Sequence, residues 1–370
     1  MATTTTTTTK SKGTVLITGL NGYIAGVIAL AFIKAGYSVR GTVRSLASAK
    51  PIVDFFSSHQ FSHQISVIEV PDITLASAFD EAVKGVTHIA HLASPVAISF
   101  EDSAAVVEAA TLGALRVLES AHKESGVKSV VFMSSIAAVR GPNRDLDGEG
   151  HSTYTYTEKD WNETSQKEVE KHGKDSGFHV YEYSKTAAER AVWNFRTTFK
   201  PSFSITSINP TFVAGPPLLT PSSPSEIHLT TKAIYLIAAG FSPLSQVAIP
   251  SIIPNTGHID AYVDVRDVAR AVLWASDVEN TEKADGERYI LCAWYAPPQA
   301  VADILRSKIP ERQQIIERGE PGKGYEPDYT FPKNFRESWD GSKFVRATGQ
   351  EYIPWEKTVL DTYEHFKGLL

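Results

Sequence analysis

A tyrosine and a lysine four positions apart are the side chains of this chain best suited to acid–base chemistry. Tyr181 and Lys185 lie in segment 180–190, which is expected to be helical, so that both occupy one helix face. An ammonium beside a phenol is expected to lower the pKa of the tyrosine toward neutrality, so that it can donate or accept a proton. Tyr183 is two residues from the lysine, on another face, and is not expected to compete. In isolation, this spacing would also suit an ordinary exposed pair.

An apolar strand that stops at two serines supplies a second group for chemistry. The segment Val131-Phe-Met-Ser-Ser-Ile-Ala-Ala138 contains Ser134 and Ser135. Ligands of open α/β sheets bind outside the carboxyl ends of the strands, so we expect the two serines at that edge. Together with a glycine turn near the start of the chain, they favour a catalytic interpretation of the tyrosine and lysine.

The glycine turn lies between a predicted strand and an apolar helix, in Val15-Leu-Ile-Thr-Gly-Leu-Asn-Gly-Tyr-Ile-Ala-Gly26. Gly19 and Gly22 let the backbone approach a pyrophosphate, and Ala25 lets the helix pack closely on the sheet. The helix N-terminus offers free N–H groups to the phosphates. Further residues of the motif are expected to bind the cofactor: Asn21, Tyr23 and Ile24. Glycine also serves tight turns in proteins that bind no nucleotide, so this motif gains weight from the others.

The end of the second predicted strand indicates which cofactor is bound. A carboxylate there would bind the ribose 2′-hydroxyl of NAD, whereas a 2′-phosphate requires positive charge. The segment Ser38-Val-Arg-Gly-Thr-Val-Arg-Ser45 contains no acid, and Arg44 is the natural partner of a 2′-phosphate. Arg40 and Lys50 could assist, but a solvated surface role is favoured for both. The sequence therefore predicts NADPH rather than NADH.

Two later strand ends are expected to complete the cofactor site. Asp72 could accept a hydrogen bond from the adenine amino group, with Ile73 beside it, or could instead cap a helix beginning near Leu75. After the fourth predicted strand, Ala93 and Ser94 are expected to line the cofactor crevice.

Two histidines of the fourth predicted strand resemble metal ligands at first sight. His88 and His91 are three apart, so their side chains project to opposite faces of the strand. We therefore predict core or edge histidines, and no metal site.

Strand-like and helix-like segments alternate from residue 13 onward, which predicts an α/β fold. We expect a Rossmann-type doubly wound parallel sheet with a smaller C-terminal substrate-binding lobe. Its strands are predicted at residues 15–18, 38–43, 65–70, 87–92, 129–134, 204–208 and 288–292. Its helices are predicted at residues 24–35, 75–83, 103–124, 228–239, 265–276 and 355–366.

The same pattern suggests domain boundaries. A disordered tail is expected at residues 1–12, and a dinucleotide-binding domain at 13–210 and 262–292, with an insertion at 141–177. Residues 211–261 and 293–370 are expected to form the substrate lobe and a closing helix.

The composition limits the class of protein. The chain has 370 residues, 42% of them apolar and 21% charged, and a net charge of −6. It shows no basic stripe for nucleic acid and no apolar run that could span a membrane. Its one cysteine, Cys292, is predicted to be a buried strand residue and suits a reducing compartment, so we expect a cytoplasmic protein. The threonine-rich start does not have the pattern of a signal peptide.

Taken together, these motifs resemble the extended short-chain dehydrogenase/reductase superfamily, and within it the dihydroflavonol 4-reductase-like group that includes fungal methylglyoxal and aldehyde reductases. The resemblance covers nearly the whole chain from residue 13. It is carried by Thr18-Gly-Leu-Asn-Gly-Tyr-Ile-Ala25, Gly41-Thr-Val-Arg-Ser45, His91-Leu-Ala-Ser-Pro95, Ser134-Ser135, Tyr181-x-x-x-Lys185, Asn209-Pro-Thr-Phe-Val-Ala-Gly-Pro216 and Tyr262-Val-Asp-Val-Arg-Asp-Val-Ala269.

The resemblance implies a role for individual residues. Ser135 matches the residue that hydrogen-bonds the substrate carbonyl, Tyr181 the general acid, and Lys185 the residue that holds the nicotinamide ribose. The segment from Pro210 to Val213 matches the one that lies along the nicotinamide ring. We therefore expect an NADPH-dependent reductase of a small aldehyde or ketone, either a monomer or a homodimer.

Two alternatives remain open at this point. A sugar-nucleotide epimerase or dehydratase on the same fold would recycle tightly held NAD, but the absence of an acid after the second strand argues against it. A regulator that senses NADP without chemistry would not need Ser135, Tyr181 and Lys185 together.

One departure from the family pattern concerns the insertion. Ser135 and Tyr181 are 46 positions apart (181 − 135), which is longer than usual for these reductases. The added segment, 141–177, is most simply a surface excursion. Its aromatic residues keep a substrate lid possible as the alternative: Tyr154, Tyr156 and Trp161.

Overall fold

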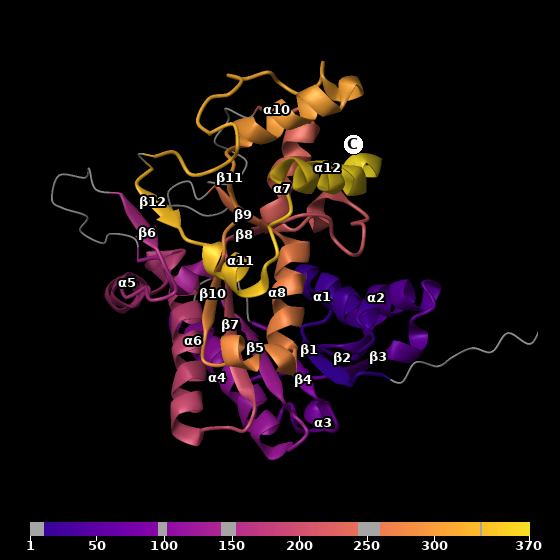
Figure 1. Ribbon diagram of the computed structural model, residues 1–370, viewed down its shortest axis with the longest axis vertical. Coiled ribbons are helices and arrows are strands. Elements are labelled where there is room, and N and C mark those ends of the chain that lie inside the picture. Colours follow the sequence, from indigo (N-terminus) through magenta and orange to yellow (C-terminus); the bar gives the residue numbers. More distant parts are fainter. Residues whose placement is uncertain (1–10, 95–101, 142–152, 243–259, 334) are drawn as a thin grey trace, which may run out of the picture.

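The computed structural model describes residues 11–94, 102–141, 153–242, 260–333 and 335–370 (Figure 1). Of the tail predicted at 1–12, all but the last two residues lie outside this part of the chain, as does Pro95.

The described residues form a seven-stranded sheet in which every strand pair is parallel. The strand order is β10-β7-β5-β4-β1-β2-β3. The chain therefore starts inside the sheet with β1, adds β2 and β3 on one side, and then adds β4, β5, β7 and β10 on the other. This confirms the predicted doubly wound, Rossmann-type fold. The strands are β1 (Thr14–Thr18), β2 (Ser38–Val43), β3 (Ile65–Glu69), β4 (His88–His91), β5 (Ser129–Met133), β7 (Ser204–Pro210) and β10 (Arg288–Leu291).

Helices cover both faces of the sheet, and each face has its own apolar core (Figure 1). Side chains alternate along a strand, so Val15 and Ile17 of β1 pack in one core and Leu16 packs in the other. The first core takes apolar residues from α1 (Tyr23–Lys34), α2 (Leu46–Ser58) and α8 (Val265–Ser276). The second takes them from α3 (Asp80–Val83), α4 (Ser103–Lys123) and α6 (His179–Phe199).

A smaller assembly lies beyond the carboxyl edge of the sheet, at the top of Figure 1. It has a three-stranded sheet in the order β11-β9-β8, with its own core, in which Trp355 is 1% exposed. Its elements are β8 (Phe212–Ala214), α7 (Leu229–Ala238), β9 (Ala261–Asp264), β11 (Trp294–Tyr295), α10 (Pro298–Lys308) and α12 (Trp355–Phe366).

The described part of segment 141–177 is folded against the later chain. It contains β6 (Tyr154–Tyr156) and α5 (Thr164–His172), and β6 pairs in parallel with β12 (Glu337–Trp339). The ring of Tyr156, which is 1% exposed, stacks on Trp339 with centroids 6.0 Å apart. Part of the segment therefore contributes to a core.

Two helix predictions need correction. The helix predicted at 75–83 is reduced to the four residues of α3, because the chain before it forms turns and Ser77 has a φ of 64°. Conversely, α2 was not predicted, although Ala49, Ile52 and Phe56 are buried at helical spacing. Its internal Pro51, which lacks an N–H, obscured the pattern.

Candidate functional site

The carboxyl ends of four neighbouring strands meet at one edge of the sheet. Because β1, β4, β5 and β7 are adjacent and parallel, this edge brings together the residues that follow them. Gly19 follows β1, Leu92 follows β4, Ser134 follows β5 and Thr211 follows β7. The predicted glycine turn, the crevice residues and the serines are thus neighbours in space.

Ser135, Tyr181 and Lys185 lie close together at this edge. Ser135 is extended and its hydroxyl oxygen accepts a hydrogen bond from the Ala137 N–H at 3.1 Å, which starts a 3₁₀ turn at Ile136–Ala138. Tyr181 and Lys185 lie in the first two turns of α6, and the Lys185 Nζ is 5.9 Å from the centre of the Tyr181 ring. The Ser135 hydroxyl lies near enough to the Tyr181 phenol to lower its pKa.

Burial shifts the pKa values of Tyr181 and Lys185 in opposite directions. It raises the pKa of Tyr181; the hydrogen bond with Ser135 opposes the rise, and the charge of Glu182 adds to it. Burial also lowers the pKa of Lys185 to about 8, against the opposing charge of Glu189. The prediction that the lysine lowers the pKa of the tyrosine is therefore wrong for this chain, because desolvation of the phenol is the larger effect.

The glycine turn has the geometry of a phosphate cradle. Gly19 has a φ of 70°, and a Cβ on it would lie 3.3 Å from the Cα of Ala93. Gly22 is the N-cap of α1 and has no side chain with which to cap it, so the first N–H groups of the helix face the turn uncovered. The turn therefore fits the phosphates of a dinucleotide.

The other motif residues around the turn, Asn21, Tyr23 and Ile24, differ in exposure and in their contacts. Asn21 is exposed and Ile24 partly buried. The hydroxyl of Tyr23 donates to the Gly215 carbonyl at 2.8 Å, and its ring stacks on His228 with centroids 4.9 Å apart. The Tyr23 hydroxyl is thus bound to the chain just after β8. The backbone N–H of Tyr23 remains available to an anion.

The fourth strand behaves as predicted for its histidines. Both are buried and lie on opposite faces, His88 bonded through Nδ1 to the Ser129 hydroxyl at 2.8 Å and His91 to the Thr18 hydroxyl at 2.9 Å. Burial lowers the pKa of His88 to about 4 and of His91 to about 3. Within the described ranges, no cluster of three or more His, Cys, Asp or Glu side chains could hold a metal ion.

Thr18 also organises the chain after β4. Its hydroxyl oxygen accepts hydrogen bonds from the N–H groups of Leu92 and Ala93, at 3.0 and 2.9 Å. With its acceptor sites in use, the hydroxyl donates its own proton to His91 Nδ1. Ala93 and Ser94 are consequently held, partly buried, beside the glycine turn.

Arg44 lies exposed at the end of β2, beside an acid that the sequence did not reveal. Val43 pairs with Glu69, the last residue of β3, and the Glu69 carboxylate accepts a hydrogen bond from the Leu46 N–H at 2.8 Å. An acid is therefore present at this edge, supplied by the adjacent strand. The sequence predicted the strand that contains Glu69, at residues 65–70, but not its register with β2.

The proposed helpers of Arg44 lie elsewhere. Arg40 donates to the carbonyls of Ala82 and Lys84, at 2.9 and 2.6 Å, and Lys50 pairs with Asp54 on the exposed face of α2. Lys50 therefore has the surface role that the sequence favoured. Arg40 does not, because it is partly buried and its guanidinium holds two backbone carbonyls at the C-terminal end of α3.

Asp72 and Ile73 are held by local contacts. The exposed Asp72 carboxylate accepts hydrogen bonds from the Thr74 hydroxyl at 2.7 Å and N–H at 2.8 Å, which lower its pKa. It stabilises a turn, and no helix begins at Leu75. Ile73 packs against α4, where a Cβ on Gly113 would lie 2.7 Å from its Cδ1.

Glu189, one turn after Lys185 in α6, is a second acid near the site that the sequence did not reveal. It is fully buried and pairs with Arg288 at 2.6 Å. Its pKa is lowered because the charge and hydrogen bonds of Arg288, with hydrogen bonds from Ser134 and Asn209, outweigh the effect of burial. Asn209 also donates to the Ser135 carbonyl at 3.2 Å, just before the buried Pro210 at the end of β7 and Val213 in β8. The only sequence signal for Glu189 was its place one turn after Lys185 on the same predicted helix.

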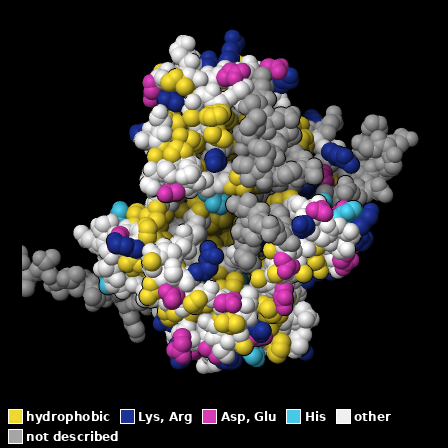
Figure 2. Space-filling view, turned by 180° about the vertical axis from the view of Figure 1, so that it is seen from behind, with side chains coloured by type: hydrophobic (Ala, Val, Ile, Leu, Met, Phe, Trp, Pro, Cys, Tyr) yellow, Lys and Arg dark blue, Asp and Glu magenta, His cyan; other side chains and the backbone are white. Residues whose placement is uncertain are grey.

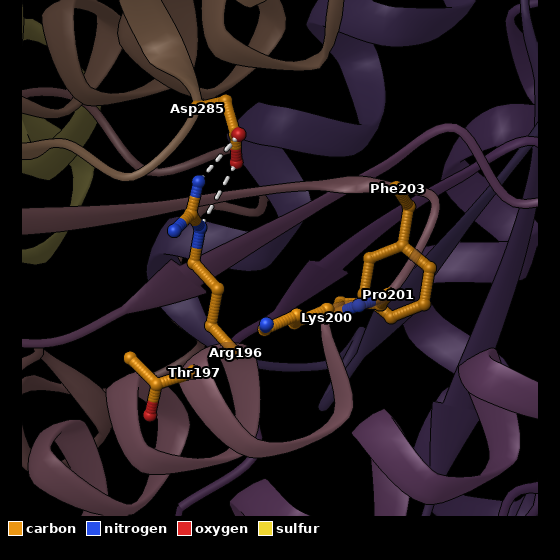
Figure 3. Close-up of a pocket in the computed structure, with 6 residues that line it drawn as sticks. All are labelled: Arg196, Thr197, Lys200, Pro201, Phe203 and Asp285. Carbon is orange, nitrogen blue, oxygen red and sulfur yellow. Dashed lines mark hydrogen bonds and ion pairs between the residues drawn. The ribbon is translucent and has the colours of Figure 1, made fainter.

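A pocket at the far end of α6 is separate from this edge (Figure 3). It has a volume of about 510 Å³ and is lined by Arg196, Thr197, Lys200, Pro201, Phe203 and Asp285. Arg196 lies 15 residues after Tyr181, roughly 22 Å along the helix axis at 1.5 Å per residue. Its guanidinium is bound to the Asp285 carboxylate by two hydrogen bonds, as Figure 3 shows.

The molecular surface carries charges of both signs. On the face shown in Figure 2, basic and acidic side chains are interspersed, and hydrophobic side chains gather around a hollow between the upper and lower parts of the molecule. Cys292 is buried, as predicted. Among the helices that the structure describes, none is long and apolar enough to cross a membrane.

Comparison with known proteins identifies relatives over nearly the full chain. The profile of the NAD dependent epimerase/dehydratase family matches residues 15–292. An uncharacterized oxidoreductase of Schizosaccharomyces pombe is 31% identical, covering 94% of this chain and 95% of that protein. The NADPH-dependent methylglyoxal reductase of Saccharomyces cerevisiae is 29% identical, covering 94% and 96%. The solved structure of yeast methylglyoxal/isovaleraldehyde reductase complexed with NADPH has a TM-score of 0.75 at 27% identity, covering 96% of this chain and all of that one.

Proposed function

Because the chain belongs to the NAD dependent epimerase/dehydratase family, we propose that it is an NADPH-dependent reductase that converts an aldehyde or ketone to the alcohol. The observation that carries the proposal is the meeting of Ser135, Tyr181 and Lys185 at the carboxyl edge of the sheet, beside an uncovered helix N-terminus. The names of two relatives, an NADPH-dependent methylglyoxal reductase and a methylglyoxal/isovaleraldehyde reductase complexed with NADPH, support it.

We assign the cofactor to the ends of β1, β2 and β4. The turn at Gly19 and Gly22 and the N-terminus of α1 would hold the pyrophosphate, and Arg44 the 2′-phosphate. Lys185 would hold the nicotinamide ribose, with Pro210 to Val213 along the ring. Asn21, Tyr23, Ile24, Asp72, Ile73, Ala93 and Ser94 complete the proposed lining. When bound, NADPH supplies the hydride.

The chain's own residues then act on the substrate oxygen. The Ser135 hydroxyl donates a hydrogen bond to the carbonyl oxygen, and Tyr181 gives it a proton as negative charge develops there. The raised pKa of Tyr181 keeps the phenol protonated through neutral pH, as a proton donor requires. Burial of the site strengthens both hydrogen bonds, because the surrounding dielectric constant is low.

A panel of small aldehydes and ketones, followed by NADPH absorbance, tests the proposal. We expect Tyr181→Phe to remain folded and to bind NADPH, with turnover reduced about 10²–10⁴-fold, the usual contribution of a general acid. Tyr183→Phe is the matched control, because it removes a hydroxyl from the same helix on another face, and it should be near neutral.

Three outcomes separate the proposal from its alternatives. Loss of activity in Tyr183→Phe with full activity in Tyr181→Phe would overturn the acid assignment. NADPH binding with no turnover of any carbonyl would favour a sensing role. Interconversion of a sugar nucleotide without net consumption of NADPH would favour an epimerase.

A further inference from the structure

We infer that Glu189 is a positioning residue of the active site, which fixes the backbone of Ser135 and supplies the negative charge that faces Lys185. The inference rests on the proposed function. Glu189 would act through other residues and would touch neither substrate nor cofactor.

The first support is the number of elements that meet at this carboxylate. Glu189 of α6 is fully buried, and its Oε2 accepts hydrogen bonds from the Ser134 hydroxyl of the β5 end at 2.6 Å and from the Asn209 amide of β7 at 2.8 Å. Its Oε1 accepts hydrogen bonds from Arg288 of β10 at 2.6 Å and from the Trp193 indole at 3.2 Å. One side chain thus ties three strands of the sheet to the helix that carries Tyr181.

The second support is a direct connection to the catalytic serine. Asn209 uses the same amide nitrogen to donate to the Ser135 carbonyl at 3.2 Å and to Glu189. Its Oδ1 interacts with the Ser207 hydroxyl at 3.1 Å, which fixes the orientation of the amide. Hydrogen bonds therefore fix both serines: Ser134 through its hydroxyl and Ser135 through its carbonyl.

The third support is electrostatic. Lys185 is 7% exposed, and the charge of Glu189 opposes the lowering of its pKa by burial. Two other titratable groups flank Lys185 on α6: Tyr181, and Glu182, whose pKa is raised by burial although its hydrogen bond with His179 opposes the rise. His91 on β4, whose pKa burial lowers to about 3, is neutral at the pH of the assay. Among the described residues, Glu189 is the one whose charge raises the pKa of Lys185.

The ion pair is also shielded from outside. The Arg288 guanidinium lies 3.9 Å from the centre of the Trp161 ring, and its Nη1 donates to the carbonyls of Glu158 and Asp160. Three residues of segment 141–177 thus contact the Arg288 side chain, and Arg288 is 7% exposed. A paired carboxylate in such a dry site is expected to be rigid and charged.

Glu189→Gln tests the charge, because it keeps the size of the side chain. We measure the dissociation constant of NADPH and kcat/KM for NADPH from about pH 6 to about pH 10. In the wild type, the dissociation constant should rise and kcat/KM should fall as the pH rises through about 8, where Lys185 loses its proton. In Glu189→Gln the break should move down by about one pH unit, because an opposite charge has been removed. Glu163→Gln, a substitution of an exposed glutamate paired with Arg190, is the matched control and should leave the break in place.

Glu189→Asp tests the positioning and keeps the charge. The shorter side chain cannot reach Ser134 and Asn209 together, so we expect kcat to fall at least about tenfold while the pH break stays at the wild-type value. If Glu189→Gln does not fold, as judged by its melting curve, this variant alone decides, and an unchanged kcat overturns the inference.

The outcomes separate the inference from the proposed function. An unmoved pH break in folded Glu189→Gln overturns the inference, even if the wild type reduces carbonyls. A wild type that binds NADPH and reduces no carbonyl overturns the proposed function, while the shift in the NADPH dissociation constant still decides the inference. A wild type that does not bind NADPH overturns both.

Discussion

Replacing Arg44 tests how the protein distinguishes NADPH from NADH. Arg44 is exposed at the end of β2, one strand from the glycine turn, and two residues before the N-terminus of α2. A charge-assisted hydrogen bond from a guanidinium contributes about 1.5–3 kcal/mol, and exposure to solvent places this one at the lower end. At about 1.4 kcal/mol per factor of ten, Arg44→Ala should weaken NADPH binding about tenfold.

The neighbouring acid sharpens this prediction. The Glu69 carboxylate occupies the Leu46 N–H at 2.8 Å, close to where an anion bound by Arg44 would lie. Glu69→Gln should therefore strengthen NADPH binding a few-fold and leave NADH nearly unchanged, and both effects should shrink at high salt.

Titration of each cofactor by fluorescence, at low and high ionic strength, measures both effects. Lys50→Ala is the matched control, because it removes a positive charge from α2 that is paired with Asp54 at the surface. Equal losses of NADPH and NADH affinity in Arg44→Ala would refute the assignment, as would a Lys50→Ala variant with the same cofactor selectivity as Arg44→Ala.

Two further predictions concern the fold. Burial raises the pKa of Cys292 to about 12, so the native thiol should resist alkylation at neutral pH and react once the chain is unfolded; equally fast reaction of the native protein would show that the thiol is accessible. Gly341→Ala would force a Cβ onto the backbone oxygen of Cys292 and should cost at least about 2 kcal/mol in the free energy of unfolding. Gly368→Ala, with no neighbour within 4 Å of its Cβ, is the control, and equal melting temperatures for the two variants would contradict the argument.

The sequence predicted most where the signal is local. The strand, glycine turn and helix from β1 to α1 follow one another within about twenty residues, and the spacing of Tyr181 and Lys185 already puts them on one helix face. The central strands were found because a buried parallel strand is a short apolar run bounded by turn residues.

What the sequence could not supply depends on pairing and burial. Glu69 was overlooked because it becomes a neighbour of Arg44 only through the register of β2 with β3. Glu189 was overlooked because its five hydrogen bonds come from residues as far apart as Ser134 and Arg288. The direction of the Tyr181 pKa shift was wrong because spacing reveals the nearby lysine but not the loss of solvent around the phenol.

The prediction for segment 141–177 depended on its composition, whereas its packing depends on residues far away in the sequence. Its polar composition favoured a surface excursion, yet Tyr156 is buried against Trp339 and Trp161 stacks on Arg288, the partner of Glu189. Glu158, Asp160 and Trp161 therefore contact Arg288, whose partner Glu189 is linked to Ser135 through Asn209. A deletion of the whole segment would open this ion pair to solvent, so its effect on turnover could not be attributed to a substrate lid. Point substitutions at exposed positions of the segment, which leave Trp161 in place, are the experiment that separates a lid from a structural support.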